Sequence, residues 1–297
     1  MTENVLKIDG LHKTYGKLTA VNKLSLEITK GSVFGLLGPN GSGKTTTLGM
    51  LLGIIKQDSG SFSWFNNGDK DVNRLKIGAL LETPNFYPYL SAEKNLKVVA
   101  EIKGRQHLKR IPEVLKAVNL FDRKDDNFKG FSLGMKQRLA IASALLSDPE
   151  VLVLDEPTNG LDPQGIAEIR QLIIDIAKSG KTIIIASHIL IEIEKICSHV
   201  VILNKGSLIK EGLIGDLLNN KPTISLKTDQ QDQLISLLKS ENLDFNLEKN
   251  QINVETENLN PADLNKKCFE HGIILSELKT TANSLEEEFI QIINDHA

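Results

Sequence analysis

A nine-residue loop, Gly38-Pro-Asn-Gly-Ser-Gly-Lys-Thr-Thr46, constrains this chain more than any other stretch of its sequence. It matches the pattern G-x-x-x-x-G-K-[ST] at every fixed position. Its glycines carry no Cβ atom, so successive backbone N–H groups can converge on an anion. The flanks agree with that role. Residues 32–37 predict a buried parallel strand, and residues 45–52 predict a helix whose positive N-terminus faces the loop.

The loop therefore predicts a site for the phosphates of a nucleotide. Lys44 is expected to reach the β- and γ-phosphates, and the Thr45 hydroxyl is expected to bind Mg²⁺. A chance match in a glycine-rich loop is the competing explanation, and the strand-loop-helix context argues against it. The expected nucleotide-binding residues of the loop are Gly38, Pro39, Asn40, Gly41, Ser42, Gly43, Lys44, Thr45 and Thr46.

Composition and charge exclude several other classes of protein. The 297 residues are enough for one large or two modest domains. The 35 Lys and Arg residues against 38 Asp and Glu residues give a formal charge of −3, so no nucleic-acid partner is expected, although the overall charge does not exclude a local basic patch. No apolar run approaches the roughly 18 residues of a membrane span, and the N-terminus lacks a signal-peptide pattern. Cys197 and Cys268 lack metal-ligand spacing and are expected to be reduced.

Hydrophobic patterns predict a large α/β domain at residues 1–220. Alternation within residues 5–28 predicts strands of an antiparallel edge sheet, and residues 199–212 predict a hairpin. A polar helical pattern predicts a helical subdomain at about 86–146, where Pro112 should break or start a helix.

A small α+β domain is predicted at residues 221–297, after a boundary at Asn220-Lys-Pro222. Its pattern, β-α-β-β-α-β, predicts a split-βαβ, ferredoxin-like sheet. Ser284 and Glu287 predict a capping box for a last helix. No titratable constellation is visible there, so a regulatory or dimer-contact role and a passive one are equally compatible with the sequence.

Three further features carry chemistry. Val151-Leu-Val-Leu-Asp-Glu156 predicts an apolar strand that ends in two carboxylates, and ligands of open α/β sheets bind at such carboxyl ends. Residues 131–146 predict a loop that runs into a strongly periodic helix. Tyr15 precedes the phosphate loop and can stack on a base, although an aromatic beside a glycine more often packs in a turn.

These motifs, in this order, resemble those of the ATP-binding subunit of an ABC transporter. Phe131-Ser-Leu-Gly-Met135 stands at the place of the family signature Leu-Ser-Gly-Gly-Gln. Asp155-Glu156 match the Walker B pair, and Asn159-Gly-Leu-Asp162 resembles the D-loop. Ala186-Ser-His188 occupies the switch-histidine position. The resemblance covers residues 1 to about 215 and implies the ABC-type nucleoside triphosphatase fold with ATP and Mg²⁺ as cofactors.

The resemblance also implies catalytic roles. Asp155 would complete the Mg²⁺ shell with Thr45. Glu156 would polarise the water that attacks the γ-phosphate, and His188 would bind that phosphate, with Lys44 as the third expected catalytic group.

Two residues of the signature imply a second chain. Ser132 and Gly134 would bind the γ-phosphate of ATP that the opposite subunit holds, through a hydroxyl, N–H groups and a helix N-terminus. The implied partner is a second copy of this chain or a paired ATPase subunit.

The sequence departs from the family pattern at two places. Leu133 and Met135 stand where Gly and Gln are usual, a pattern that resembles exporters of the bacitracin and lantibiotic-immunity type. Glu82 stands where the family has the Q-loop glutamine, and it is expected to be a Mg²⁺ ligand beside Thr45 and Asp155, or else a solvent-exposed strand end.

The resemblance thus implies an ATPase on the cytoplasmic face of the membrane that drives export through a separate permease subunit. The aromatics in Pro84-Asn-Phe-Tyr-Pro-Tyr89 are expected to dock on that subunit or to pack inside the helical lobe. The rival is a soluble ATPase of the same superfamily that acts on ribosomes or DNA. One phosphate loop and no sustained heptads favour the transporter.

Overall fold

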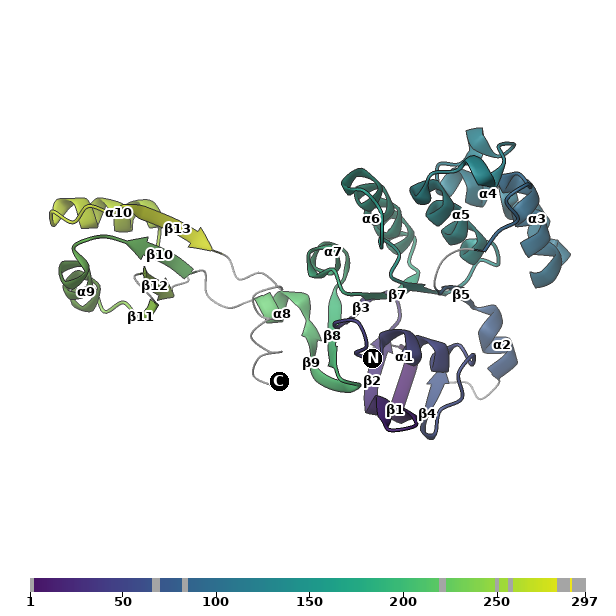
Figure 1. Ribbon diagram of the computed structural model, residues 1–297, viewed down its shortest axis with the longest axis horizontal. Helices are drawn as coiled ribbons and strands as arrows, with labels where there is room; N and C mark the ends of the chain where they lie inside the picture. The colour runs from purple at the N-terminus through teal and green to yellow at the C-terminus, as the bar shows by residue number, and fades with distance from the viewer. Residues whose placement is uncertain are drawn as a thin grey trace. The chain divides into compact units, whose positions relative to one another are not determined.

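The computed structural model describes residues 3–65, 70–81, 85–218, 223–248, 251–255, 259–281 and 289 (Figure 1). The chain divides into two compact units, residues 1–214 and 215–297. The predicted features at Glu82, Asn220–Pro222, Ser284 and Glu287 lie outside the described residues. Among the residues described, no helix is long and apolar enough to cross a membrane.

The first unit is organised on a six-stranded sheet in the order β5-β6-β7-β3-β8-β9. Neighbouring strands are parallel except for β8 and β9, which form the predicted hairpin. Strands β3, β6 and β7 are buried along their whole length, as expected of parallel strands covered on both faces. The strands are β3 (Val33–Leu37), β5 (Ile77–Leu80), β6 (Val151–Asp155), β7 (Thr182–Ser187), β8 (His199–Asn204) and β9 (Ser207–Leu213).

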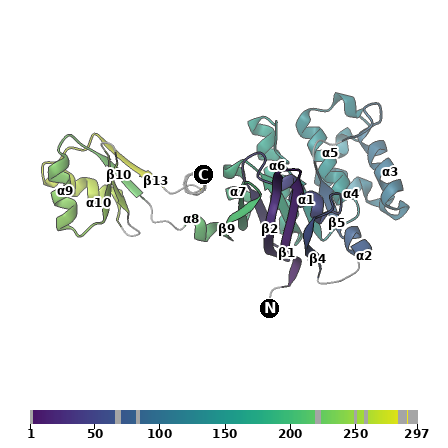
Figure 2. The same cartoon turned by 60° about the horizontal axis from the view of Figure 1, so that its bottom comes forward.

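A second sheet lies beside the first and is antiparallel, as predicted (Figure 2). Its strands are ordered β2-β1-β4, with bounds Asn4–Tyr15 for β1, Leu18–Thr29 for β2 and Ser59–Trp64 for β4. Helix α1 (Lys44–Leu51) shares one apolar core with both sheets, because Leu48 and Met50 pack with residues of β1, β2, β3 and β7. This core fixes the start of α1 against the second sheet. This unit also contains the helices α2 (Lys70–Leu75), α6 (Pro163–Lys178) and α7 (Leu190–Ile196).

Residues 92–145 form a helical lobe within this unit (Figure 1). Ser91 caps the first helix by accepting a hydrogen bond from the Lys94 N–H at 3.3 Å. Pro112 starts a helix, since its missing N–H costs nothing in the first turn. The elements are α3 (Ala92–Lys103), η1 (Arg105–Arg110), α4 (Ile111–Ala117), η2 (Phe121–Arg123), η3 (Phe128–Gly130) and α5 (Leu133–Leu145).

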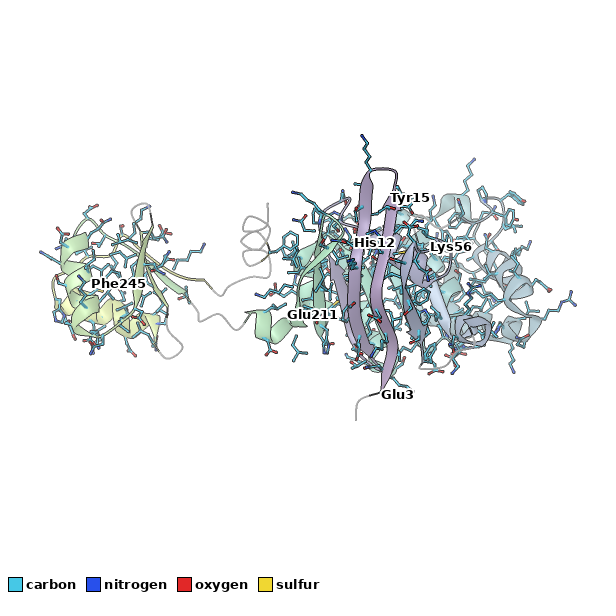
Figure 3. All side chains as sticks on the ribbon, turned by 90° about the horizontal axis from the view of Figure 1, so that it is seen from below. Glu3, His12, Tyr15, Lys56, Glu211 and Phe245 are labelled. Carbon is cyan, nitrogen blue, oxygen red and sulfur yellow. The ribbon has the colours of Figure 1, made fainter. Side chains whose placement is uncertain are left out.

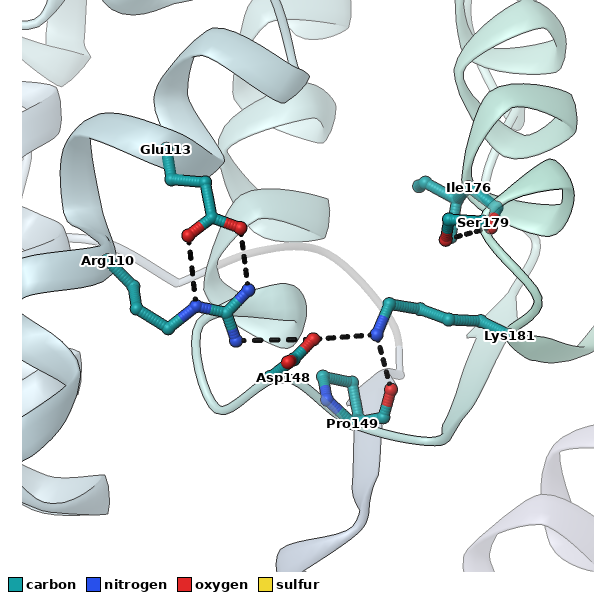
Figure 4. A network of polar contacts seen from close by, with 7 residues as sticks. All are labelled: Arg110, Glu113, Asp148, Pro149, Ile176, Ser179 and Lys181. Carbon is teal, nitrogen blue, oxygen red and sulfur yellow. Dashed lines mark hydrogen bonds and ion pairs between the residues drawn. The ribbon is translucent and has the colours of Figure 1, made fainter.

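An ion-pair network ties this lobe to the N-terminal ends of the sheet strands (Figure 4). Arg110 pairs with Glu113 at 2.9 Å and with Asp148 at 3.3 Å. Lys181 donates to Asp148 and to the Pro149 carbonyl oxygen, both at 2.8 Å. The hydrogen bond from Lys181 holds the pKa of Asp148 below its usual range. The bond from Arg110 does the same to the pKa of Glu113.

The second unit forms the predicted split-βαβ sheet. The order β11-β12-β10-β13 is antiparallel throughout, and β12 separates β10 from β11. Leu226, Leu238 and Cys268 lie in its apolar core. After α8 (Ile214–Leu218), its elements are β10 (Thr223–Lys227), α9 (Gln231–Ser240), β11 (Phe245–Glu248), β12 (Gln251–Glu255), α10 (Pro261–Glu270) and β13 (Glu277–Thr281).

The network predicts a pH-dependent contribution to stability. Since the pKa of Asp148 is lowered in the folded state, its contribution is present above the unfolded pKa of about 3.9 and lost as pH falls through the folded pKa. Asp148→Asn should lower the free energy of unfolding at pH 7 by about 0.5 to 1 kcal/mol, because the Asp148 carboxylate is largely exposed to solvent. The difference from wild type should shrink as the pH falls below about 3.9.

Urea unfolding followed by fluorescence measures this difference, because Trp64 is the only tryptophan and lies in the first unit. Asp175→Asn is the matched control, since Asp175 lies on α6 and accepts a hydrogen bond from the neutral Gln171. A deficit of Asp148→Asn that stays constant from pH 7 to pH 3 would contradict the assignment.

Candidate functional site

The phosphate loop requires glycine where the chain packs most closely. Gly43 has a φ of 102°, and a Cβ there would lie 2.2 Å from the Ala20 carbonyl oxygen. A Cβ on Gly38 would lie 2.4 Å from the Leu203 carbonyl oxygen. Larger residues would push the loop off its neighbours, so these glycines set its shape.

The loop is also bonded to the turn between β8 and β9. The Gly206 N–H donates to the Ser42 carbonyl oxygen at 3.1 Å, and the Asn22 N–H donates to the Gly206 carbonyl oxygen at 2.7 Å. The sequence places Gly206 only within the hairpin predicted at residues 199–212, in its turn. Its contact with the loop depends on β8 lying beside β3, which no local pattern reports.

Lys44 lies at the centre of the loop. Its side chain is 5% exposed, and its Nζ donates to the Gly38 carbonyl oxygen at 2.7 Å and to that of Pro39 at 3.3 Å. The Glu156 carboxylate lies 3.5 Å from the same nitrogen. A buried ammonium at the N-terminus of α1, within a glycine-rich loop, is a strong site for anionic oxygens.

Strand register brings the remaining charged groups to this loop. Leu37 pairs with Ser187, and Asp155 pairs with Ala186, so three parallel strands end at nearly the same level. The next residues, Gly38, Glu156 and His188, therefore leave the sheet at one edge.

Glu156 is held in an unusual backbone conformation. Its φ is 47°, a region that residues with a side chain rarely adopt, and its N–H donates to the Ala186 carbonyl oxygen at 2.9 Å. This turn directs the carboxylate between Lys44 and His188, whose Nδ1 lies 2.8 Å from Glu156 Oε2. The three side chains that the sequence nominated as catalytic thus meet at one point.

Two oxygen donors near the loop suit a hard cation. Asp155 ends β6 and is 5% exposed, while Thr45 is exposed in the first turn of α1. Mg²⁺ keeps several waters and takes one or two carboxylates, so this donor set fits it. The described residues contain no group of three or more His, Cys, Asp or Glu side chains that would form an all-protein cage.

The signature residues lie on a different element, at the start of α5. Ser132 caps this helix by accepting from the Met135 N–H at 3.2 Å, and it is exposed. A Cβ on Gly134 would approach Leu161 only to 4.0 Å. In the described part of the chain, neither residue is hydrogen-bonded to the phosphate loop. The structure therefore brings Lys44, Glu156 and His188 together and leaves Ser132 and Gly134 of the signature apart from them.

Tyr15 lies at the end of β1, paired with Leu18 across the hairpin. It is 48% exposed, and the Lys13 Nζ lies 5.4 Å from its ring centroid. Lys13 in turn pairs with Asp58 at 2.7 Å. The sequence analysis singled out neither Lys13 nor Asp58. A lone Asp before a strand belongs to no chemical motif.

Comparison with known proteins agrees with this geometry. The ABC transporter family pattern matches residues 21–159. The chain is 40% identical over 298 residues to the bacitracin transport ATP-binding protein BcrA of Bacillus licheniformis, with 97% of each chain covered. It is 42% identical over 207 residues to the lantibiotic transport ATP-binding protein SrtF of Streptococcus pyogenes, which covers 70% of this chain and 90% of SrtF.

A solved structure shares the fold of most of this chain. It is a dimeric ATP-binding cassette in a post-hydrolysis state, bound to ADP and Pi. The likeness has a TM-score of 0.61 and 28% sequence identity, and it covers 70% of this chain and 98% of that chain.

Proposed function

This chain belongs to the ABC transporter family as an ATP-binding, ATP-hydrolysing subunit, and on that premise we propose that it drives the export of a peptide antibiotic through a separate membrane subunit. The cluster of Lys44, Glu156 and His188 at the phosphate loop carries the enzymatic part of the proposal. The substrate class is suggested by BcrA and SrtF, which are named for transport of bacitracin and of a lantibiotic. The chain would act at the cytoplasmic face of the membrane.

ATP would be held by the loop from Gly38 to Thr46, with Lys44 exchanging its carbonyl contacts for the β- and γ-phosphates. Thr45 and Asp155 would hold Mg²⁺, and Glu82, which lies outside the described residues, is proposed as a further ligand in place of the family's glutamine. The bound Mg²⁺ would neutralise charge on the phosphates.

Glu156 would polarise the attacking water, and the geometry supports this role. Its carboxylate lies between a buried cation and an imidazole that can bind the γ-phosphate and restrict the water's position. Its strained backbone is compatible with a group held in place for chemistry rather than for stability.

The complete site would need two chains. Ser132 is exposed and Gly134 has open space beside it at the N-terminus of α5, and among the described residues neither is hydrogen-bonded to its own phosphate loop, so they would bind the γ-phosphate held by a partner. The similarity to a dimeric cassette supports this arrangement. The partner would be a second copy or a paired ATPase subunit.

Glu156→Gln tests the proposal directly. The amide keeps the shape of the side chain but cannot accept the proton of water, so hydrolysis should fall at least about 100-fold while ATP still binds. With ATP and Mg²⁺, the variant should accumulate as a dimer in light scattering.

Glu150→Gln is the matched control, since Glu150 directly precedes the same strand at its opposite end. It should hydrolyse ATP at the wild-type rate and should not accumulate as a dimer. A Glu156→Gln protein that turns over ATP normally, or that stays monomeric with the membrane subunit present, would count against the proposal.

Docking on the membrane subunit is proposed for the aromatic residues within 86–89, a stretch that precedes the helical lobe. Phe86 packs edge-on against Phe128 with ring centroids 5.2 Å apart, so it contributes to the packing of the lobe. Tyr87 and Tyr89 are 49% and 71% exposed and lie against each other, with centroids 5.8 Å apart. Exposed, paired tyrosines are suited to the centre of an interface.

A photo-crosslinker placed at Tyr87 should therefore capture the membrane subunit in isolated membranes. The same probe at Ile54, an exposed residue outside the lobe, should not. Capture that is equal at both positions, or absent at position 87, would exclude this docking surface.

The rival function, a soluble ATPase acting on ribosomes or DNA, has less support. Relatives that match the whole or most of the chain are named for transport. The net charge of −3 also provides no overall attraction to nucleic acid.

A further inference from the structure

The end of β1 near the phosphate loop is irregular, and one carboxylate holds it. The pairing of β1 with β2 shifts between Leu11 and Lys13 and again between Lys13 and Thr14. Asp58 bridges this stretch. Its N–H donates to the His12 carbonyl oxygen at 2.9 Å, and its carboxylate accepts from the Thr14 N–H at 2.7 Å and the Thr14 hydroxyl at 2.8 Å. Irregularities of this kind re-aim the side chains that follow them.

The same carboxylate also fixes the side chain that lies over Tyr15. Lys13 donates to Asp58 Oδ1 at 2.7 Å, and its Nζ lies 5.4 Å from the centroid of the Tyr15 ring. The Lys13 side chain is only 16% exposed, whereas Tyr15 is 48% exposed. One face of the ring is thus occupied by a held cation, and the remainder of the ring is open.

This open ring lies within reach of a nucleotide in the phosphate loop. Lys13 is paired with Val21, and the Val21 side chain and the Ala20 carbonyl oxygen flank Gly43 of the loop. Tyr15 is two residues further along the strand, which is about 7 Å. Figure 3 shows His12 and Tyr15 towards the same end of the strand pair, with Glu3 at the opposite end.

We infer that Asp58 is a positioning residue for the nucleotide base: through Lys13 and Thr14 it sets the orientation of Tyr15, which stacks on the base. The inference rests on the proposed binding of ATP at this loop. Hydrogen bonds from Lys13 and Thr14 hold the pKa of Asp58 far below its usual range, so the carboxylate is charged at neutral pH. Asp58 itself does not touch the phosphates in this scheme.

Loss of Asp58 should weaken binding of the base and leave binding of the phosphates unchanged. Asp58→Asn should weaken ATP binding about five-fold, which is within the range of one stacked base. The same variant should bind inorganic tripolyphosphate as tightly as wild type, because that ligand has no base. Tyr15→Ala should show the same selective loss. The double variant should be no weaker than Tyr15→Ala alone, because Asp58 acts only through the ring.

Both affinities are measured by calorimetry on the full chain with Mg²⁺ present. Glu27→Gln is the matched control, since Glu27 also accepts a hydrogen bond from a β1 lysine, Lys7 at 2.8 Å, and one from Asn4 at 2.6 Å. Glu27 pairs with Lys7 near the other end of the strand pair, so the control should leave both affinities unchanged.

The two affinities distinguish a positioning role of Asp58 from a structural role and from failure of the proposed function. A selective loss of ATP affinity that disappears in the Tyr15→Ala background supports the inference. An equal loss of ATP and tripolyphosphate affinity would mean that Asp58 is only structural, and unchanged ATP affinity would also overturn the inference. Failure of the wild-type protein to bind either ligand would instead contradict the proposed function.

Discussion

The hydrogen-bond register of three parallel strands is the constraint on which the rest of the site depends. Because β3, β6 and β7 end at one level, the residues that follow them leave the sheet together. A slip of one residue in β6 would point Asp155 to the opposite face and move Glu156 away from Lys44. The fully buried strands that enforce this register therefore determine the chemistry, although Asp155 at the end of β6 is the one side chain of theirs to which the proposal gives a part in it.

Strain and close packing around the loop follow from the same constraint. Glu156 adopts a positive φ, and Gly43 approaches the Ala20 carbonyl oxygen more closely than any side chain would allow. The backbone conformation of Glu156 costs on the order of 1 to 3 kcal/mol and persists only where the surroundings over-determine it, whereas glycine adopts a positive φ without that cost. Here the surroundings are the shared core of α1 and two sheets, which ties the second sheet, and with it Tyr15, to the phosphate loop.

The sequence predicts the parts of this site that are local. The loop, the strand before it and the helix after it lie within about 20 consecutive residues, so spacing and apolar pattern suffice. The β-α-β-β-α-β order of the second unit is likewise readable from alternation. The meeting of Lys44, Glu156 and His188 is different, because it depends on β6 and β7 lying next to β3 in space, and only the family resemblance suggested it.

Side-chain and backbone contacts that depend on strand register cannot be predicted from the sequence. Asp58 carries no motif, yet four hydrogen bonds place it against β1. Gly206 was assigned to a turn and also holds the loop. Of the aromatic residues proposed for docking, Phe86 proved to be lobe packing while Tyr87 and Tyr89 are exposed, a division that composition could not reveal.

The central claim, that each active site combines the phosphate loop of one chain with the signature of another, is tested most directly by mixing two inactive variants. Lys44→Ala removes the phosphate-binding ammonium. Gly134→Asp adds a carboxylate that repels the γ-phosphate, and the open space at this position lets the helix keep its fold.

Each variant alone should be inactive. An equal mixture should recover about one quarter of the wild-type ATPase rate, because half of randomly paired dimers are mixed and each of these has one intact site. A mixture that remains as inactive as its components would contradict the account, since it would place both halves of the site in the same chain.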